Sequence, residues 1–315
     1  MIDSRPMLQL HNLYRYFGQT RAVDNVSFSV RRGEVFGYIG PNGAGKTTSM
    51  RILATLDLPT SGDATVDGFS VVDDPDRVRL RLGFMPDNFG TYPNVNVREY
   101  LDFFARAYKF TGRERKMAVE RVMDFTGLDV LAEKPTTGLS KGMKQRLCLG
   151  RTLIHDPAVL VLDEPAAGLD PRARIELRVM IRALADQGKT ILISSHILTE
   201  LAEICDVVGI IERGQLIVTG TVDEIQQQCR KPHNSVEVRV IGDAAPLAKW
   251  LCEQADVSEL HANGSSATFT HAGDPQAEAD LLRSMIEAGF RVVAFGSQEQ
   301  TLEDVFMHVT KGLVQ

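Results

Sequence analysis

Residues 40 to 48 of the chain, GPNGAGKTT, constrain its fold more strongly than any other segment. They fit the pattern G-x-x-x-x-G-K-[ST], in which glycines let backbone N–H groups wrap phosphates at the start of a helix. The apolar run VFGYI (35–39) precedes them and is typical of a strand buried on both faces of a parallel sheet. This order of strand, loop and helix favours nucleotide binding over a chance glycine-rich turn. The predicted phosphate-binding residues are Gly40, Pro41, Asn42, Gly43, Ala44, Gly45, Lys46, Thr47 and Thr48.

A second apolar run ends in two adjacent carboxylates, in the segment VLVLDEP (159–165). Asp163 at the strand tip is expected to hold Mg²⁺ or its water, together with the Thr47 hydroxyl. Glu164 would sit beside the γ-phosphate and orient or deprotonate an attacking water. The alternative is a solvated glutamate at a strand end, which a phosphate-binding loop in the same sheet makes less favoured. We therefore interpret Glu164 as the residue that orients or deprotonates the attacking water.

A third apolar run, TILISSH (190–196), ends in His196. Ligands of open α/β sheets bind at the carboxyl ends of the strands, so His196 would point at the same phosphates. A histidine after a strand is often structural, but this position favours the functional interpretation. The sequence therefore predicts that Lys46, Glu164 and His196 share one site.

The chain is expected to form two domains, because its periodicity changes along its length. Residues 1–225 form an α/β body, in which an antiparallel, half-solvated strand precedes the buried runs and a helical subdomain occupies about 89–155. A hairpin turning at Arg213-Gly214 closes this body. The polar stretch 226–235 is the candidate linker, and 236–315 read as a small α+β unit of ferredoxin-like order, with a last helix over TLEDVFMHVT.

A second anion-binding helix start is predicted at GLSKGMKQRL (138–147). Ser140 is a plausible cap, and Gly142 leaves the backbone N–H groups bare. The loop at 40–48 holds all three phosphates of its own nucleotide, so a second such site implies a second nucleotide. A plainly capped helix is the alternative.

Composition and charge exclude several classes of function. The net charge of −6 argues against a nucleic-acid surface, and no apolar run approaches the roughly 18 residues that span a bilayer. The first residues, MIDSRPMLQL, lack the apolar core of a secretory signal. Four scattered cysteines form no C-x-x-C pair and are expected to be reduced. We expect a cytoplasmic protein without nucleic acid as a partner.

The motifs occur in the order found in ATP-binding subunits of ATP-binding cassette (ABC) transporters, which the chain resembles across residues 8 to 220. They are Walker A (40–48), the signature (139–143), Walker B (159–164), the D-loop AGLD (167–170) and the switch His196. The resemblance implies a P-loop NTPase fold with an antiparallel β subdomain, ATP and Mg²⁺ as ligands, and Phe17 stacked on adenine. It also implies that the signature of one subunit closes over the ATP of a second copy or a homologous subunit. Residues contacting ATP in trans would be Ser140, Lys141, Gly142 and Asp170.

Three positions depart from the usual pattern of that family. The signature is LSKGM, in which Lys141 replaces a glycine and adds positive charge where phosphate is expected. Asp87, in GFMPDNFG, stands where the family usually has a glutamine. Its carboxylate would accept a hydrogen bond from Mg²⁺-bound water, which places Asp87 on the metal side of the site, but unlike an amide it cannot donate one. Ala167 replaces a common serine.

The resemblance extends to partners and to a branch of the family. The signature, Asp87 and TLEDVFMHVT (301–310) resemble those of exporters of drugs, lipids or polysaccharides. A separate integral membrane permease would dock near NFGTYPNVNVREY (88–100), placing the chain on the cytoplasmic face of the membrane. The alternatives are an ABC ATPase that acts on DNA or ribosomes without transport, and a regulatory module that binds ATP without hydrolysing it.

Overall fold

The computed structural model describes residues 5–90, 92–197, 201–229, 234–254 and 256–298. Within it the chain divides into two compact units, Met1–Val222 and Asp223–Gln315. The first unit carries every residue predicted for the nucleotide site. Among the described residues, no helix is both long and apolar enough to cross a membrane.

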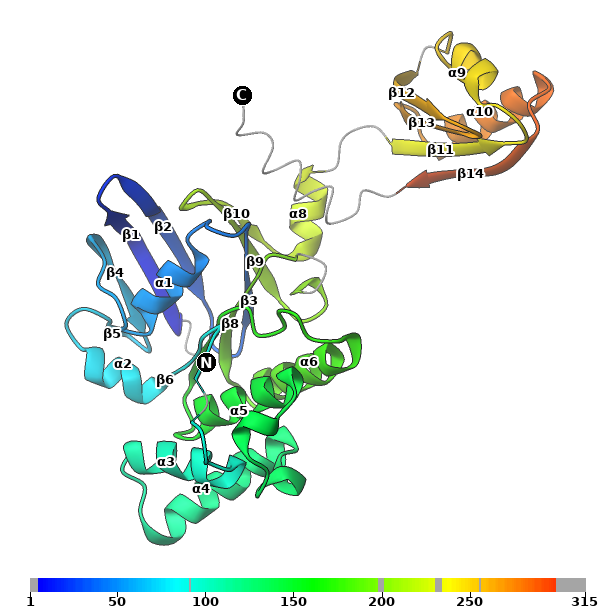
Figure 1. Cartoon of the computed structure of the whole chain (residues 1–315). Helices are drawn as coiled ribbons and strands as arrows, with labels where there is room; N and C mark the ends of the chain where they lie inside the picture. The colour runs from blue at the N-terminus through cyan, green and yellow to red at the C-terminus, as the bar shows by residue number, and fades with distance from the viewer. Residues whose placement is uncertain (1–4, 91, 198–200, 230–233, 255, 299–315) are drawn as a thin grey trace. The chain divides into compact units, whose positions relative to one another are not determined.

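A six-stranded sheet forms the centre of the first unit, in the order β10-β9-β3-β8-β7-β6. Figure 1 labels β3, β6, β8, β9 and β10 of this sheet. Strands β6, β7, β8, β3 and β9 run parallel to one another, and β10 runs antiparallel to β9. The strand bounds are β3 Val35–Ile39, β6 Leu82–Met85, β7 Val159–Leu162, β8 Thr190–Ser195, β9 Val207–Glu212 and β10 Gln215–Gly220.

The three apolar runs of the sequence form the middle of this sheet, as predicted. Every residue of β3, β7 and β8 is buried. Strand β6 is not apparent from the sequence, because it is short and contains Gly83. A Cβ at Gly83 would lie 2.6 Å from the carbonyl oxygen of Thr152, so helix α5 (Lys141–Leu153) approaches this strand more closely than any side chain allows.

The first unit also contains an antiparallel sheet, in the order β2-β1-β4-β5. Its strands are β1 Leu8–Phe17, β2 Thr20–Val30, β4 Ser61–Val66 and β5 Phe69–Ser70. Helix α1 (Lys46–Leu53) contributes Met50, Ile52 and Leu53 to one apolar core shared by both sheets. Within that core the rings of Phe28 and Phe36 stack with centroids 4.7 Å apart. The core fixes the start of α1, and with it the phosphate-binding loop.

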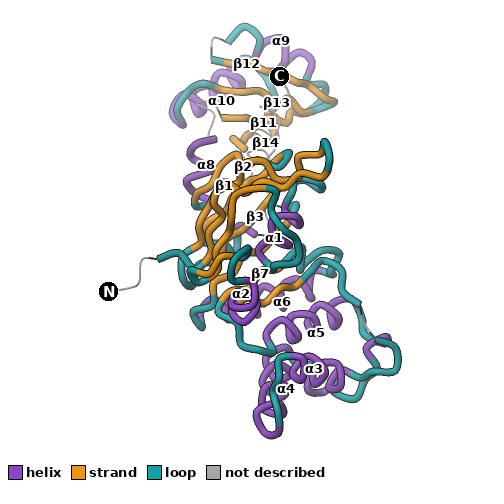
Figure 2. Tube along the Cα trace, turned by 90° about the vertical axis from the view of Figure 1, so that its left-hand side faces the viewer, coloured by secondary structure: helices purple, strands orange, loops and turns teal. Residues whose placement is uncertain are grey.

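The helices α3 (Val97–Ala107), α4 (Gly112–Thr126) and α5 form the predicted helical subdomain and gather at one end of the unit (Figure 2). Asn96 and Glu99 start α3 with a reciprocal capping box. Two single-turn helices, η1 Asp129–Leu131 and η2 Thr136–Gly138, lead into α5. Helices α2 (Pro75–Arg81) and α6 (Pro171–Asp186) also belong to this unit.

The second unit contains a sheet in the order β12-β13-β11-β14, whose neighbours all pair antiparallel. Its elements are β11 Asn234–Val240, α9 Ala245–Leu251, β12 Val257–Asn263, β13 Ser266–His271, α10 Pro275–Glu287 and β14 Val292–Gln298. This is the ferredoxin-like βαββαβ order. Strand β12 escapes sequence reasoning because it carries polar residues on both faces.

The linker expected over 226–235 differs from the structure at both ends. Residues 226–229 belong to helix α8 (Val222–Cys229), and Asn234 and Ser235 begin strand β11. Ile225 is buried and anchors this helix, so its polar neighbours need not form a loop. The helix expected over 301–310 lies outside the described residues.

Candidate nucleotide site

The phosphate-binding loop has a backbone that its glycines alone permit. Gly43 and Gly45 adopt φ of 81° and 104°, in the left-handed region that other residues avoid. A Cβ at Gly45 would lie 2.2 Å from the carbonyl oxygen of Ala22. The loop connects β3 to α1, as the sequence predicts, and α1 begins at Lys46 without a side-chain cap. Its first N–H groups are therefore directed at the loop.

The Lys46 ammonium lies at the centre of the site and is 5% exposed. It donates to the carbonyl oxygens of Gly40 at 2.6 Å and Pro41 at 3.2 Å. Its Nζ also lies 3.4 Å from Oε1 of Glu164, whose side chain is 14% exposed. A buried cation between a glycine-rich loop and a carboxylate is suited to bind a terminal phosphate.

Glu164 holds its carboxylate between two predicted site residues. Its Oε2 lies 2.9 Å from Nδ1 of His196, at the end of β8. Its Oε1 is buried and accepts no hydrogen bond from the described residues. This oxygen has the Lys46 cation beside it but no hydrogen-bond donor in the part of the chain that the structure describes, so it can still accept the proton of a water, as a general base does. The backbone of Glu164 has φ of 48°, an uncommon conformation for a residue with a side chain.

Asp163 is 1% exposed, and its carboxylate contacts Ser194, whereas that of Glu164 contacts Lys46 and His196. Burial raises the pKa of Asp163, and the nearby carboxylates of Glu164 and Asp87 act in the same direction. Hydrogen bonds from Ser194 and Thr47 to Asp163 oppose this shift. Asp163, Thr47 and Asp87 thus meet at one edge of the sheet.

These donors fit a magnesium ion. Mg²⁺ is held in nucleotide sites by one or two carboxylates or hydroxyls, by phosphate oxygens and by water. Asp163 and Thr47 supply a carboxylate and a hydroxyl in mutual contact, and Asp87 adds a second, exposed carboxylate nearby. The backbone N–H of Asp163 donates to the carbonyl oxygen of Met85 at 2.8 Å, which joins the end of β7 to the strand leading into Asp87.

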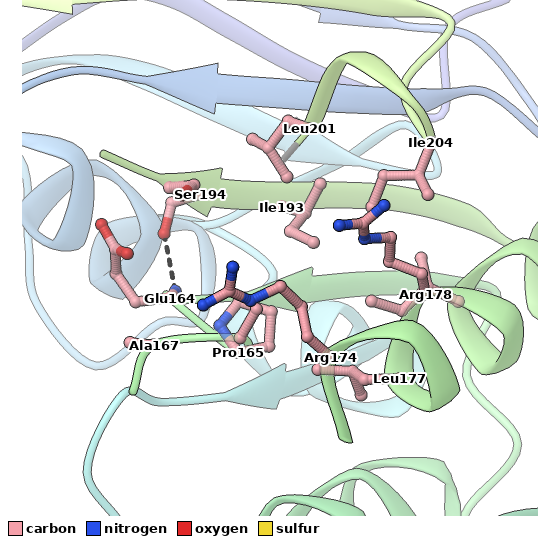
Figure 3. Close-up of a pocket in the computed structure, with 13 residues that line it drawn as sticks. Glu164, Pro165, Ala167, Arg174, Leu177, Arg178, Ile193, Ser194, Leu201 and Ile204 are labelled. Atoms are coloured by element: carbon pink, nitrogen blue, oxygen red, sulfur yellow. Dashed lines mark hydrogen bonds between the residues drawn. The ribbon is translucent and has the colours of Figure 1, made fainter. Parts of the chain in front are cut away.

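Ser194 is a site residue that sequence reasoning missed. Its hydroxyl is 2.7 Å from Oδ1 of Asp163. It is also 2.9 Å from the backbone nitrogen of Glu164, a contact that Figure 3 shows as a dashed line. The available signal was a serine inside an otherwise apolar run that ends beside His196.

A small pocket lies behind Glu164, between helix α6 and strand β8 (Figure 3). Arg174 and Arg178 of α6 extend into it, and Leu177, Ile193 and Ile204 complete its apolar wall. Arg174 is 3.5 Å from the carbonyl oxygen of Leu169, and Arg178 pairs with Glu203. Arg174 therefore supports the loop that follows Glu164, and Arg178 joins α6 to the segment that follows β8.

The start of α5 and the D-loop lie against each other. The Ser140 hydroxyl accepts from the backbone N–H of Met143 at 3.3 Å, so it caps α5 as predicted. Asp170 caps α6 in the same way, through Ala173 at 2.9 Å. Lys141, expected to attract phosphate, extends along Gly168, where its ammonium fills the space that a Cβ would need. A Cβ at Gly142 would lie 3.1 Å from that of Ala173, so this contact requires a small residue.

No described hydrogen bond or ion pair joins Ser140, Lys141 or Gly142 to Lys46 or Glu164 of the same chain. The geometry brings together Lys46, Thr47, Asp87, Asp163, Glu164 and His196, and leaves the signature residues outside this group. Phe17, at the end of β1, is 48% exposed, with the Arg15 guanidinium 4.3 Å from its ring centroid. Its free face is available to a planar ligand.

Comparisons with known proteins identify the family of both units. The family model described as ABC transporter matches residues 23–167, and that of the DrrA1-3-like ATP-binding protein C-terminal domain matches 220–310. The Nod factor export ATP-binding protein I of Ralstonia nicotianae is 35% identical over 98% of this chain and 95% of its own length. The bacitracin transport ATP-binding protein BcrA of Bacillus licheniformis is 33% identical over 97% of this chain and 98% of its own.

Among solved structures, a dimeric bacterial ABC transporter cassette aligns with a TM-score of 0.62 at 25% identity, over 69% of this chain and 99% of that one. The similarity to the two relatives extends across both units, and the similarity to the cassette accounts for most of the first. The chain belongs to the ATP-binding subunits of the ABC transporters.

Proposed function

We propose that this chain hydrolyses ATP and uses the energy to drive transport through a separate membrane protein. The observation that carries the proposal is the cluster of Lys46, Glu164 and His196, joined at 3.4 Å and 2.9 Å beside the phosphate-binding loop. Lys46 would stabilise negative charge on the terminal phosphates. Glu164 would accept the proton of the attacking water through Oε1, which accepts no hydrogen bond among the described residues, and His196 would hold that carboxylate in place.

Asp163 and Thr47 would hold Mg²⁺, with Asp87 near enough to accept from a metal-bound water. The ion, when bound, neutralises charge that develops on the phosphates. The protein's own part is to orient the Asp163 carboxylate through hydrogen bonds from the hydroxyls of Ser194 and Thr47, which also act against the rise in its pKa that burial causes. Phe17 would supply a surface for the adenine ring.

Two copies, or this chain and a homologous subunit, would form two composite sites. The N-terminus of α5 is a positive helix end capped by Ser140 and separate from the site of its own chain. It is suited to the phosphates of a nucleotide held by the other copy, with Lys141, Gly142 and Asp170 beside it. The dimeric arrangement of the related cassette supports this pairing.

The permease would dock on the first unit, in a groove between the central sheet and the helical subdomain. Leu56, Phe84, Phe104 and Tyr108 contribute its apolar lining. Two aromatic side chains nearby are about half exposed. Tyr92 lies in the segment 88–100 that resembles the docking surface, and Phe103 lies just after it in α3. Such docking would place the chain on the cytoplasmic face of the membrane. Relatives named for export and transport support outward transport over a function without transport.

The test is recovery of a membrane partner. The tagged chain, purified from detergent-solubilised membranes, should bring down a protein with several membrane spans, and Leu56→Asp should lose it. Val130→Asp is a matched control, because Val130 is 83% exposed in η1 and lies outside the groove lining. Recovery of ribosomes or nucleic acid in place of a membrane protein would contradict transport. Absence of Mg²⁺-dependent phosphate release by the wild-type chain would contradict the ATPase.

A further inference from the structure

Ser194 is a polar residue in the middle of a buried sheet. It lies in β8, between β3 and β7, and its exposed fraction is 0%. The three residues before it, Ile191, Leu192 and Ile193, are buried and apolar. A buried hydroxyl needs partners for both its donor and its acceptor sites, or it destabilises the fold. Both partners of Ser194 belong to the Walker B segment.

The directions of these two hydrogen bonds follow from the atoms. The backbone N–H of Glu164 can only donate, so the Ser194 oxygen accepts from it at 2.9 Å. The one proton of the hydroxyl is then donated to Oδ1 of Asp163 at 2.7 Å. Ser194 therefore holds the side chain of one acidic residue and the backbone of the next.

Holding these two groups separates two carboxylates that are adjacent in sequence. The N–H held by Ser194 belongs to a residue with φ of 48°, a conformation that the surroundings must enforce. With that backbone, the Glu164 carboxylate reaches Lys46 and His196. The Asp163 carboxylate reaches Thr47. One hydroxyl thus contacts both the predicted metal-side acid and the backbone that aims the predicted base.

We propose that Ser194 is a positioning residue for ATP hydrolysis, which orients Asp163 toward Mg²⁺ and Glu164 toward the attacking water. The inference rests on the proposed ATPase function. It adds Ser194 to the residues proposed for hydrolysis, from outside both the phosphate-binding loop and the acidic pair of Asp163 and Glu164. A merely structural serine would affect stability alone. A positioning serine affects metal-dependent nucleotide binding and turnover separately from stability.

The test compares Ser194→Ala, which removes the hydroxyl, with Ser194→Thr, which keeps it. Thr190→Val is the matched control, because Thr190 lies in the same strand, is 1% exposed, and its hydroxyl also accepts a backbone N–H, from Gly33 at 3.0 Å. Dissociation constants of a non-hydrolysable ATP analogue are measured with Mg²⁺ and with EDTA, alongside kcat and KM for ATP and the melting temperature.

Mg²⁺ should raise the affinity for the analogue, and we expect this increase to be about tenfold smaller in Ser194→Ala than in the wild type. The reason is that the buried Asp163 carboxylate loses a hydrogen-bond donor. Affinity in EDTA should stay within about twofold, because the phosphate-binding loop is untouched. We expect kcat to fall at least about tenfold with KM little changed. Ser194→Thr should recover both values, and Thr190→Val should lower only the melting temperature.

Equal loss of affinity with Mg²⁺ and with EDTA, or a fall in kcat no larger than that of Thr190→Val at similar stability, would overturn the proposal. If Ser194→Ala does not fold, Ser194→Cys keeps the size with a weaker donor and should show the same Mg²⁺-specific loss in smaller measure. If the wild-type chain hydrolyses no ATP, the proposed function fails, and the analogue-binding comparison still decides the role of Ser194.

Discussion

Glu164→Gln should abolish turnover and strengthen nucleotide binding at the same time. In the structure the Glu164 carboxylate is 3.4 Å from the Lys46 ammonium, and the two side chains are 14% and 5% exposed. At an effective dielectric constant of about 20, this separation corresponds to a gross attraction of about 5 kcal/mol. A phosphate that recruits Lys46 competes with that attraction. Glutamine has the same shape without the charge and removes the competition.

The net gain is smaller than the gross attraction, because desolvation offsets much of a buried ion pair and Lys46 keeps its acceptors on Gly40 and Pro41. We take roughly a third, about 1.5 kcal/mol, which lowers the dissociation constant about tenfold. Loss of the general base should lower kcat by about a hundredfold or more. Because the amide leaves the phosphate-binding loop intact, an ATP-dependent dimer should persist in size-exclusion chromatography.

The assay measures phosphate release and the dissociation constant of a non-hydrolysable ATP analogue in wild type and variant. Glu120→Gln is the control, because Glu120 lies on the surface of α4 and pairs only weakly, at 3.8 Å, with Lys116. Normal turnover by Glu164→Gln would remove this residue from its catalytic role. Unchanged analogue affinity would show that the pair with Lys46 does not compete with phosphate.

Three further predictions follow from single contacts. Ser140→Arg should reduce turnover to roughly a tenth or less while the monomer still binds ATP normally by fluorescence titration; loss of monomer binding would contradict a site in trans. Phe17→Ala should raise the dissociation constant for ATP about tenfold but not that for inorganic triphosphate, and Phe17→Tyr should restore it. Burial lowers the pKa of His155 to about 4 from 6.5, so the unfolded chain binds a proton that the folded chain does not. Stability is then lost as the pH falls below 6.5, by about 1 to 2 kcal/mol at pH 5, and urea unfolding of His155→Phe should lack this loss.

Much of the fold was predictable because its determinants are local. The runs that became β3, β7 and β8 are apolar on both faces, which identifies buried parallel strands without reference to the rest of the chain. Strands β6 and β12 were not predictable, since one depends on close approach of α5 to Gly83 and the other has polar residues on both faces. Helix α8 was not predictable either, because burial of Ile225 outweighs its polar composition.

The sequence by itself determined which residues carry the proposed chemistry, since a glycine-rich loop after an apolar run and acids at strand ends need no distant partner to be recognised. Only the tertiary structure decided how those residues are aimed. Ser194 and Asp163 are 31 positions apart, and Lys46 and Glu164 still farther, so their contacts exist only once β3, β7 and β8 lie side by side. The same holds for Lys141, whose charge suggested phosphate but whose side chain lies along Gly168. The type of a residue limits the chemistry of its side chain, and packing between distant segments decides which groups that side chain contacts.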